Sequence, residues 1–155
     1  MIHYRNEVPR SGVNGRALVA TARRLLAAAN LPEGDLSLSL VDDSRIRGLN
    51  RTYRGKDRAT DVLSFPLASA SDASPEPLLG DVVISVETAR RQAEEYDASL
   101  QCEVYRLLIH GLLHLMGHDH VASTERRAMR REERRLAKAI GLPWPYANDG
   151  NAPTG

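Results

Sequence analysis

The sequence is nearly free of cysteine, because Cys102 is the only one among 155 residues. One cysteine excludes an internal disulfide and a zinc ribbon built from cysteines, and it suits a reducing compartment. The sequence also lacks any apolar run near the roughly 18 to 20 residues that would cross a bilayer. Its first ten residues contain no apolar core like that of a secretory signal peptide. We therefore expect a cytoplasmic protein that does not contact a membrane.

An excess of one charge sign is also absent, since 21 lysines and arginines face 20 aspartates and glutamates. The charges are nevertheless unevenly distributed. Residues 45–58 contain six basic residues and one acid, and residues 125–138 contain seven basic residues and three acids. Basic segments on a near-neutral chain can contact a polyanion. Either segment alone is also typical of a solvated helix face.

The length and the order of the hydrophobic patterns predict one α+β domain. A chain of 155 residues fits a single domain. We expect that domain over residues 1–147, with a disordered tail over 148–155. Leu36, Leu38 and Leu40 alternate with serines, which is the period of a half-buried strand. The expected strands cover 1–5, 36–40, 60–65 and 80–86, and the expected helices cover 14–31, 43–53, 87–96, 99–116 and 123–140. A loop is expected over 68–77. The predicted fold is a small mixed β-sheet packed with helices.

Four of the five histidines lie within residues 110–120, whose sequence is H-G-L-L-H-L-M-G-H-D-H. His110 and His114 are four residues apart on a predicted helix, so their rings share one face and can bind one metal ion. Gly117 follows one turn later, where a helix commonly ends in a left-handed residue. The chain can then reverse and bring His118 or His120 over the same face. The alternative is a pair of hydrogen-bonded core histidines.

Imidazole nitrogens favour zinc, with nickel, copper and iron(II) as alternatives. Three protein ligands leave one position of zinc open, which is typical of a catalytic site and predicts hydrolysis. Zinc proteases of the H-E-x-x-H type place a glutamate directly after the first histidine as general base. Gly111 occupies that position here, although the spacing of His110, His114 and His120 equals that of the longer zincin motif. Hydrolysis of a peptide bond is therefore disfavoured.

The histidine segment resembles the signature H-G-x-L-H-L-x-G-Y-D-H of the YbeY family, bacterial rRNA maturation factors and endoribonucleases. Two further segments resemble the same family. They are residues 50–66, N-R-T-Y-R-G-K-D-R-A-T-D-V-L-S-F-P, and residues 79–85, L-G-D-V-V-I-S. The resemblance extends from about residue 36 to Ile140, with the segments in order and at family-like spacing.

This resemblance implies one zinc ion per chain, bound by His110, His114 and His120, and a functional arginine at Arg54. We regard Arg54 and His114 as the candidate catalytic residues. The sequence departs from the family at His118, where tyrosine is usual. We prefer His120 as the third ligand because its spacing from His114 matches both the family and the zincin pattern.

Arg54 could clamp two phosphate oxygens in the transition state, with Lys56 and the neighbouring arginines holding the flanking RNA backbone. A salt bridge from Arg54 to Asp57 or Asp61 is the alternative. Asp119 could orient a ligand imidazole or cap the turn.

The leading functional hypothesis is a zinc-dependent endoribonuclease, specific for single strands, that acts in 16S rRNA 3′-end maturation and in ribosome quality control. Its expected partners are the 16S rRNA precursor and the small ribosomal subunit with its assembly factors, and not DNA. One alternative is a non-catalytic ribosome-assembly factor whose metal is structural. Another is a zinc hydrolase that acts on a different class of substrate.

Overall fold

The computed structural model describes residues 1–66, 78–118 and 123–143. The loop expected over 68–77 and the tail expected over 148–155 lie outside these residues. Within them, the four expected strands and five expected helices all form. The strands are β1 (Ile2–Asn6), β2 (Asp35–Val41), β3 (Val62–Pro66) and β4 (Leu78–Ser85), and the helices are α1 (Gly15–Ala28), α2 (Asp43–Arg54), α3 (Val86–Glu95), α4 (Leu100–Leu115) and α5 (Ser123–Ala139).

The four strands form one sheet in the order β1-β2-β4-β3. β1 pairs with β2, and β2 with β4, in parallel, whereas β3 pairs with β4 in the antiparallel direction. The predicted mixed sheet is therefore confirmed. β3 begins two residues later than expected, at Val62, because the carboxylate of Asp61 accepts a hydrogen bond from the backbone N–H of Val62 at 2.8 Å. Among the described strands, none pairs with the outer edge of β3, which we call its free edge.

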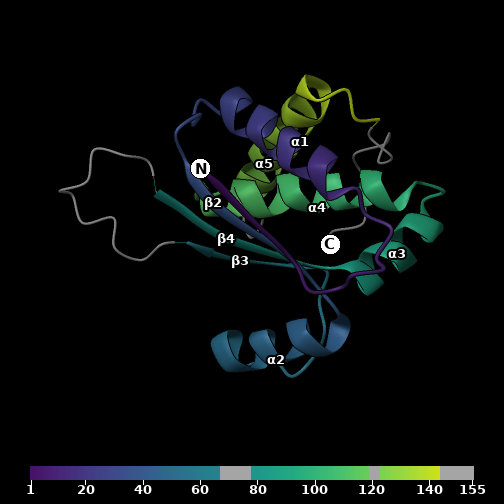
Figure 1. The fold of residues 1–155 in the computed structure, drawn as a ribbon. Coiled ribbons are helices and arrows are strands. Elements are labelled where there is room, and N and C mark those ends of the chain that lie inside the picture. The colour runs from purple at the N-terminus through teal and green to yellow at the C-terminus, as the bar shows by residue number, and fades with distance from the viewer. Residues whose placement is uncertain (67–77, 119–122, 144–155) are drawn as a thin grey trace.

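The helices lie on both faces of the sheet (Figure 1). α1, α4 and α5 cover one face, and α2 lies on the other. The central strands alternate as predicted, since Leu36, Leu38 and Leu40 are fully buried between serines of intermediate exposure. In β4, Val82 packs into the larger core and Val83 into the smaller core beneath α2. The sheet is thus buried on both faces at its centre.

Several helix boundaries follow from capping side chains and from residues in a left-handed conformation. Asn14 caps α1 by accepting a hydrogen bond from Ala17 N, and Ser99 caps α4 by accepting one from Cys102 N. Gly141, at φ +69°, follows the end of α5. α1 ends at Ala28, earlier than expected, since Asn30 adopts a left-handed conformation at φ +62°. No helix in the described parts of the chain is long and apolar enough to cross a membrane.

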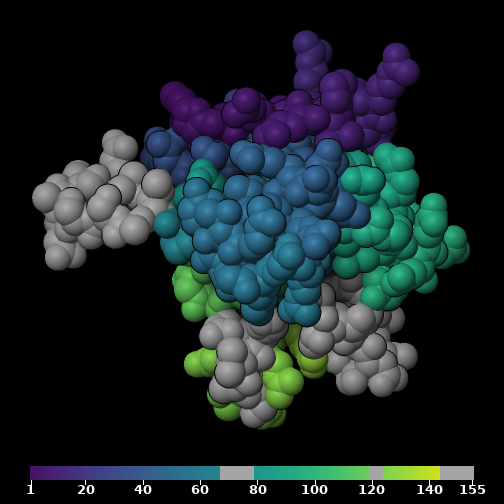
Figure 2. Space-filling view, turned by 90° about the horizontal axis from the view of Figure 1, so that it is seen from below, coloured from purple at the N-terminus to yellow at the C-terminus, as the bar shows by residue number. Residues whose placement is uncertain are grey.

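α2 is the helix that carries the first basic segment to the surface. Figure 2 shows it in the middle of the face seen from below. Asp42 caps the helix by accepting a hydrogen bond from Arg45 N, and Gly55 ends it in a left-handed conformation at φ +69°. Ile46 and Asn50 are its buried residues, so most of its arginines are free to face solvent. Its last residue, Arg54, reaches the free edge of β3.

Candidate active site

The first part of the site is the histidine pair on α4. His110 and His114 lie one turn apart near the end of this helix, and their Nε2 atoms are 3.1 Å apart. Two imidazole nitrogens bound to one tetrahedral zinc ion at its usual bond length would be roughly 3.3 Å apart. The two rings therefore already have the separation that a shared metal ion requires.

The helix ends just after this pair, as the glycine at position 117 predicts. Gly117 has φ +90° and donates its N–H to the carbonyl of His114 at 3.0 Å. His118 N then donates to the carbonyl of Leu113, so the chain turns back over the end of the helix. The expected reversal is present up to His118, and the next residues, Asp119 and His120, lie outside the described part of the chain.

A carboxylate from α5 holds the other side of His110. Glu133 Oε1 lies 3.4 Å from His110 Nδ1, and both side chains are largely buried. A carboxylate against Nδ1 favours the tautomer with a proton on that nitrogen, which makes Nε2 the acceptor nitrogen of the ring. The sequence analysis did not identify Glu133. Its position was nevertheless visible, because it is four residues after Met129 and three before Leu136, on the apolar face of α5.

The third ligand is not tested by the described residues. Among them, no third histidine, cysteine, aspartate or glutamate joins His110 and His114 in a metal-binding group. His118 is half-buried and lies near α5 rather than in the pocket. The pKa of Glu132 is lowered first by its hydrogen bond from Arg135, and the charge of His118 contributes in the same direction.

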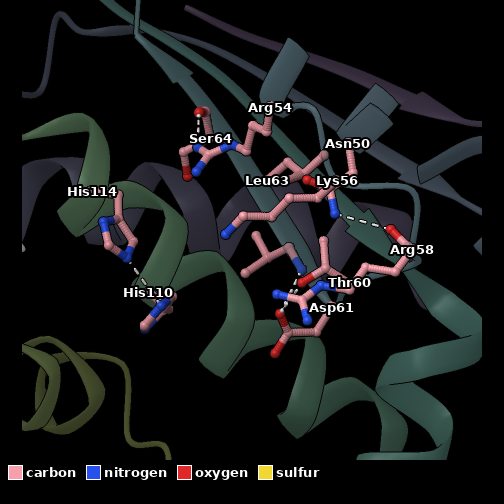
Figure 3. A pocket seen from close by; sticks show the side chains of 11 residues that line it. Asn50, Arg54, Lys56, Arg58, Thr60, Asp61, Leu63, Ser64, His110 and His114 are labelled. Atoms are coloured by element: carbon pink, nitrogen blue, oxygen red, sulfur yellow. Dashed lines mark hydrogen bonds between the residues drawn. The ribbon is translucent and has the colours of Figure 1, made fainter. Parts of the chain in front are cut away.

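The histidine pair forms one wall of a pocket of about 180 Å³ beside the free edge of β3 (Figure 3). α2 and the loop that follows it form the opposite wall. The pocket is lined by Asn50, Arg54, Lys56, Arg58, Thr60, Asp61, Val62, Leu63, Ser64, His110 and His114. Three cationic side chains and two imidazoles therefore face one hollow, which is a suitable arrangement for a phosphodiester.

Arg54 lies at the rim of this pocket and donates a hydrogen bond from Nη2 to the carbonyl oxygen of Ser64 at 3.1 Å. Neither of the carboxylates considered as its partner pairs with it among the described residues. Asp57 instead binds Arg47 at 2.9 Å, and the pKa of Asp57 is lowered by that hydrogen bond. The Arg54 guanidinium thus contacts a neutral acceptor, and no carboxylate of the described residues forms an ion pair with it.

Asp61 is the one carboxylate among the pocket-lining residues that the structure describes, and its exposed fraction is 8%. It accepts hydrogen bonds from Val62 N, from the Thr60 hydroxyl and from Gln92 Nε2. These three donors link the start of β3 to α3. Asp61 therefore has a structural role that accounts for its burial.

Asn50 is a pocket residue that the sequence analysis did not identify. It is almost fully buried, and its Nδ2 donates to the carbonyl of Arg58 at 2.9 Å. Its own carbonyl accepts from Lys56 N at 3.3 Å. Asn50 thereby fixes the loop that presents Lys56 and Arg58 to the pocket. No local pattern could have shown this, because the contacts depend on how the loop folds back over α2.

Gly111, the position of the missing protease base, points into the sheet rather than into the pocket. A Cβ atom at this position would lie 2.8 Å from Val82 Cγ1 and 3.1 Å from Ser64 Oγ. The Ser64 hydroxyl also donates to the carbonyl of Gly111 at 3.0 Å. Glycine is required for this close approach of α4 to the strands, so a glutamate could not stand here as a general base.

Comparison with known proteins places this chain in a family. A family model described as Endoribonuclease YbeY matches residues 4–141. A protein named Endoribonuclease YbeY from Anaeromyxobacter sp. (strain Fw109-5) is 47% identical over 149 residues, which are 96% of this chain and 77% of that protein. Proteins of the same name from Alkaliphilus metalliredigens and Desulfitobacterium hafniense are 53% and 43% identical, covering 72% and 88% of this chain and 74% and 90% of their own lengths.

The fold has a counterpart among solved structures. The solution structure of TM1509 from Thermotoga maritima matches with a TM-score of 0.60 at 22% sequence identity, covering 99% of this chain and 100% of that one. This similarity concerns the fold alone. The family match over most of the chain and the high identity of the curated relatives confirm the resemblance seen in the three sequence segments. The chain belongs to the endoribonuclease YbeY family, a family of metalloenzymes that cleave RNA.

Proposed function

We propose that this protein is a zinc-dependent endoribonuclease that cleaves single-stranded RNA in the pocket between α2 and α4. The 16S rRNA precursor is its proposed substrate, with cleavage serving 3′-end maturation and ribosome quality control on the small ribosomal subunit in the cytoplasm. The observation that carries the proposal is the arrangement of the pocket. The paired histidine Nε2 atoms lie on one wall, and Arg54, which forms an ion pair with no carboxylate in the described part of the chain, lies on the other.

As a member of the family, the protein is a hydrolase that cuts phosphodiester bonds within RNA during rRNA processing. The pocket is suited to that reaction because a phosphodiester gains negative charge on its way to the transition state. Charged groups preorganised around the phosphorus stabilise that charge without rearranging. Arg54, Lys56 and Arg58 supply positive charge on the α2 side of the pocket.

The proposed metal ligands are His110 and His114, completed by His120. The 3.1 Å separation of the two Nε2 atoms and the carboxylate of Glu133 against His110 support this set. Zinc bound there would supply a Lewis acid for hydrolysis. The role of Glu133 is to hold the ring of His110 in place and to keep its Nε2 unprotonated toward the pocket.

Arg54 has the role of binding the scissile phosphate. Its bond to the Ser64 carbonyl holds the guanidinium at the rim, and the other nitrogen atoms of the group remain available to phosphate oxygens. Lys56 and Arg58 would hold the flanking backbone, because both are exposed and both line the pocket. Single-stranded RNA fits this arrangement better than a duplex, since its backbone can bend into a hollow at the edge of a sheet.

The proposal is tested by RNA cleavage with purified wild-type protein beside His114→Ala, each with its metal content measured. The wild type should contain near one equivalent of metal and cleave single-stranded RNA. His114→Ala should lose most of the metal and most of the cleavage together. Equal cleavage by both proteins would show that the activity does not come from this pocket.

A further inference from the structure

One side of α5 carries only positive charge. Arg127, Arg131, Arg134 and Lys138 follow one another at intervals of four, three and four residues, which places them along one side of a helix. All four are exposed. We call this row the α5 stripe. The buried residues of the helix, Met129, Leu136 and Ala137, lie on its other side and face the core.

The acids of α5 are not placed to neutralise this row. Helix neighbours that touch are three or four residues apart. None of Glu125, Glu132 and Glu133 is at either distance from any member of the stripe. Glu132 binds Arg135 at 2.7 Å, and Glu133 lies against His110 at 3.4 Å. Glu132 and Glu133 therefore make their direct contacts with other residues. Arg131 adds only a smaller charge contribution to the lowered pKa of Glu132, whose main cause is the hydrogen bond from Arg135.

The members of the stripe are instead each other's helix neighbours, and like charges at this spacing repel. A helix face that only meets water usually alternates the two signs of charge. Within the described residues, Arg127, Arg131 and Lys138 form no ion pair. The packing of the helix does not explain them either, because α5 contacts α1 through Arg135, whose Nη1 donates to the carbonyl of Ala28 at 2.9 Å.

We propose that the α5 stripe is a second RNA-binding surface, which contacts the phosphate backbone of the substrate outside the cleavage pocket. The choice of RNA among polyanions rests on the proposed function. Arg127 and Lys138 are eleven residues apart, or roughly 16 Å along a helix. One cation per helical turn is a spacing comparable with that of successive phosphates along an RNA strand. The contact carries no sequence preference, because phosphates are the same at every nucleotide.

The position of the stripe separates it from the chemistry. Among the described residues, none of α5 lines the pocket. The helix contacts the site through Glu133, which lies against His110, and the stripe lies on another side of the helix. The basic surface of α2 lies across the sheet from α5 (Figure 1). RNA bound to the stripe would leave the pocket open. The stripe would therefore raise the affinity for long RNA, through two linked contacts, without changing the cleavage of short RNA.

The test is the variant Arg127→Gln/Arg131→Gln/Lys138→Gln in the full chain, since glutamine keeps a helix propensity close to that of arginine and lysine. Affinity is measured at several salt concentrations for a long rRNA-precursor transcript, and cleavage is measured on a short oligoribonucleotide. The affinity for the transcript should fall about tenfold or more, and the slope of log affinity against log salt should decrease by about two. The cleavage rate of the oligoribonucleotide should stay at the wild-type value.

The matched control is Arg5→Gln/Arg10→Gln/Arg16→Gln, which removes the same charge from exposed arginines near the other end of the chain. It should bind the transcript nearly as well as wild type. An equal loss of transcript affinity in both triple variants would mean that RNA is attracted by the overall positive charge and not by the α5 stripe, and would overturn the proposal. Wild-type affinity for the transcript in the α5 triple variant would also overturn the proposal. So would a loss of transcript affinity in Arg127→Lys/Arg131→Lys, which keeps the charge, as large as the loss in the triple variant. Failure of the wild-type protein to cleave any RNA would instead contradict the proposed function. The comparison of RNA affinities would still test the α5 stripe, because binding is measured without cleavage.

Discussion

Arg54 is held in its position by a neutral acceptor, the carbonyl of Ser64, and not by a carboxylate. An arginine in an ion pair would have to give up that partner before it could bind phosphate. Arg47, two turns earlier on the same side of α2, is such a residue, because it binds Asp57 at 2.9 Å through Nε. Arg54 can therefore bind phosphate without first breaking an ion pair, whereas Arg47 cannot.

Replacing Arg54 with alanine should lower the single-turnover cleavage rate by about a hundredfold or more, as expected when one preorganised donor is lost. RNA affinity should fall much less, because Lys56 and Arg58 remain at the pocket. Arg54→Lys should recover little, since an ammonium group cannot make the planar two-point contact. The matched control is Arg47→Ala, which should cleave at nearly the wild-type rate. A wild-type rate in Arg54→Ala would remove this residue from the catalytic set.

Glu133 is the carboxylate that orients His110, and Glu133→Gln should weaken metal binding by about tenfold or more. The reason is that an amide favours the metal-binding tautomer of the ring less strongly than a carboxylate does. Competition against a chromogenic chelator measures this affinity directly, without RNA. Glu132→Gln is the control, because Glu132 binds Arg135 and not a histidine. Equal metal affinity in both variants would contradict the orienting role.

At the level of elements, the contact between α4 and the sheet sets the position of the histidines. Gly111→Ala should destabilise the protein by about 1 to 3 kcal/mol, because the added Cβ would meet Val82 and Ser64 where there is no room. Gly48→Ala is the control within α2. A Cβ atom there would meet nothing within 4 Å, so this substitution should increase stability slightly. Chemical denaturation compares the two. Equal midpoints would show that the close approach at Gly111 is not needed.

α2 is held against α3 by the carboxylate of Asp43, which accepts hydrogen bonds from Ser85, Thr88 and Arg91. Burial alone would raise the pKa of Asp43, but these three donors outweigh it, and the pKa lies below its usual value of 3.8. Its contribution to stability is therefore complete above pH 3.8 and is lost as the pH falls through the lowered pKa.

Asp43→Asn should cost about 2 kcal/mol of stability at neutral pH and much less in strong acid. Denaturant unfolding at a series of pH values measures the difference. Asp57→Asn, which removes an exposed ion pair, should change stability little at any pH. A pH-independent loss in Asp43→Asn would show that the ionised carboxylate is not what links α2 to α3.

The elements themselves were largely predictable, because their signals are local. The alternation of leucine and serine in β2, the caps at Asn14 and Ser99, and the glycine turn at 117 all depend on neighbours within a few residues. The strand order was not predictable from such signals. It depends on pairing between distant segments, and β3 joins β4 in the antiparallel direction at an edge that no local pattern marks.

At the level of the whole molecule, local patterns also predict part of the site, and contacts between distant segments determine the rest. The spacing of His110 and His114 predicted their shared face, and the structure brings them together. Glu133 and Asn50 were missed, because their roles exist only once α5 packs on α4 and the loop after α2 folds back. Sequence spacing alone does not decide whether Arg54 binds phosphate or forms a salt bridge with Asp57 or Asp61. In the structure Asp57 pairs with Arg47, and Asp61 accepts hydrogen bonds from Val62 N and Gln92. Neither carboxylate pairs with Arg54 among the described residues.

The central claim is that RNA cleavage needs one metal ion on the histidine motif and the charge of Arg54 across the pocket from it. The most direct measurement is a zinc titration of metal-free full-length protein, followed by single-turnover cleavage of single-stranded RNA. The cleavage rate should rise to a plateau at one equivalent of zinc. Arg54→Ala should bind the same equivalent and remain slow. Wild-type cleavage by metal-free protein, or a rate that does not follow zinc occupancy, would contradict the claim.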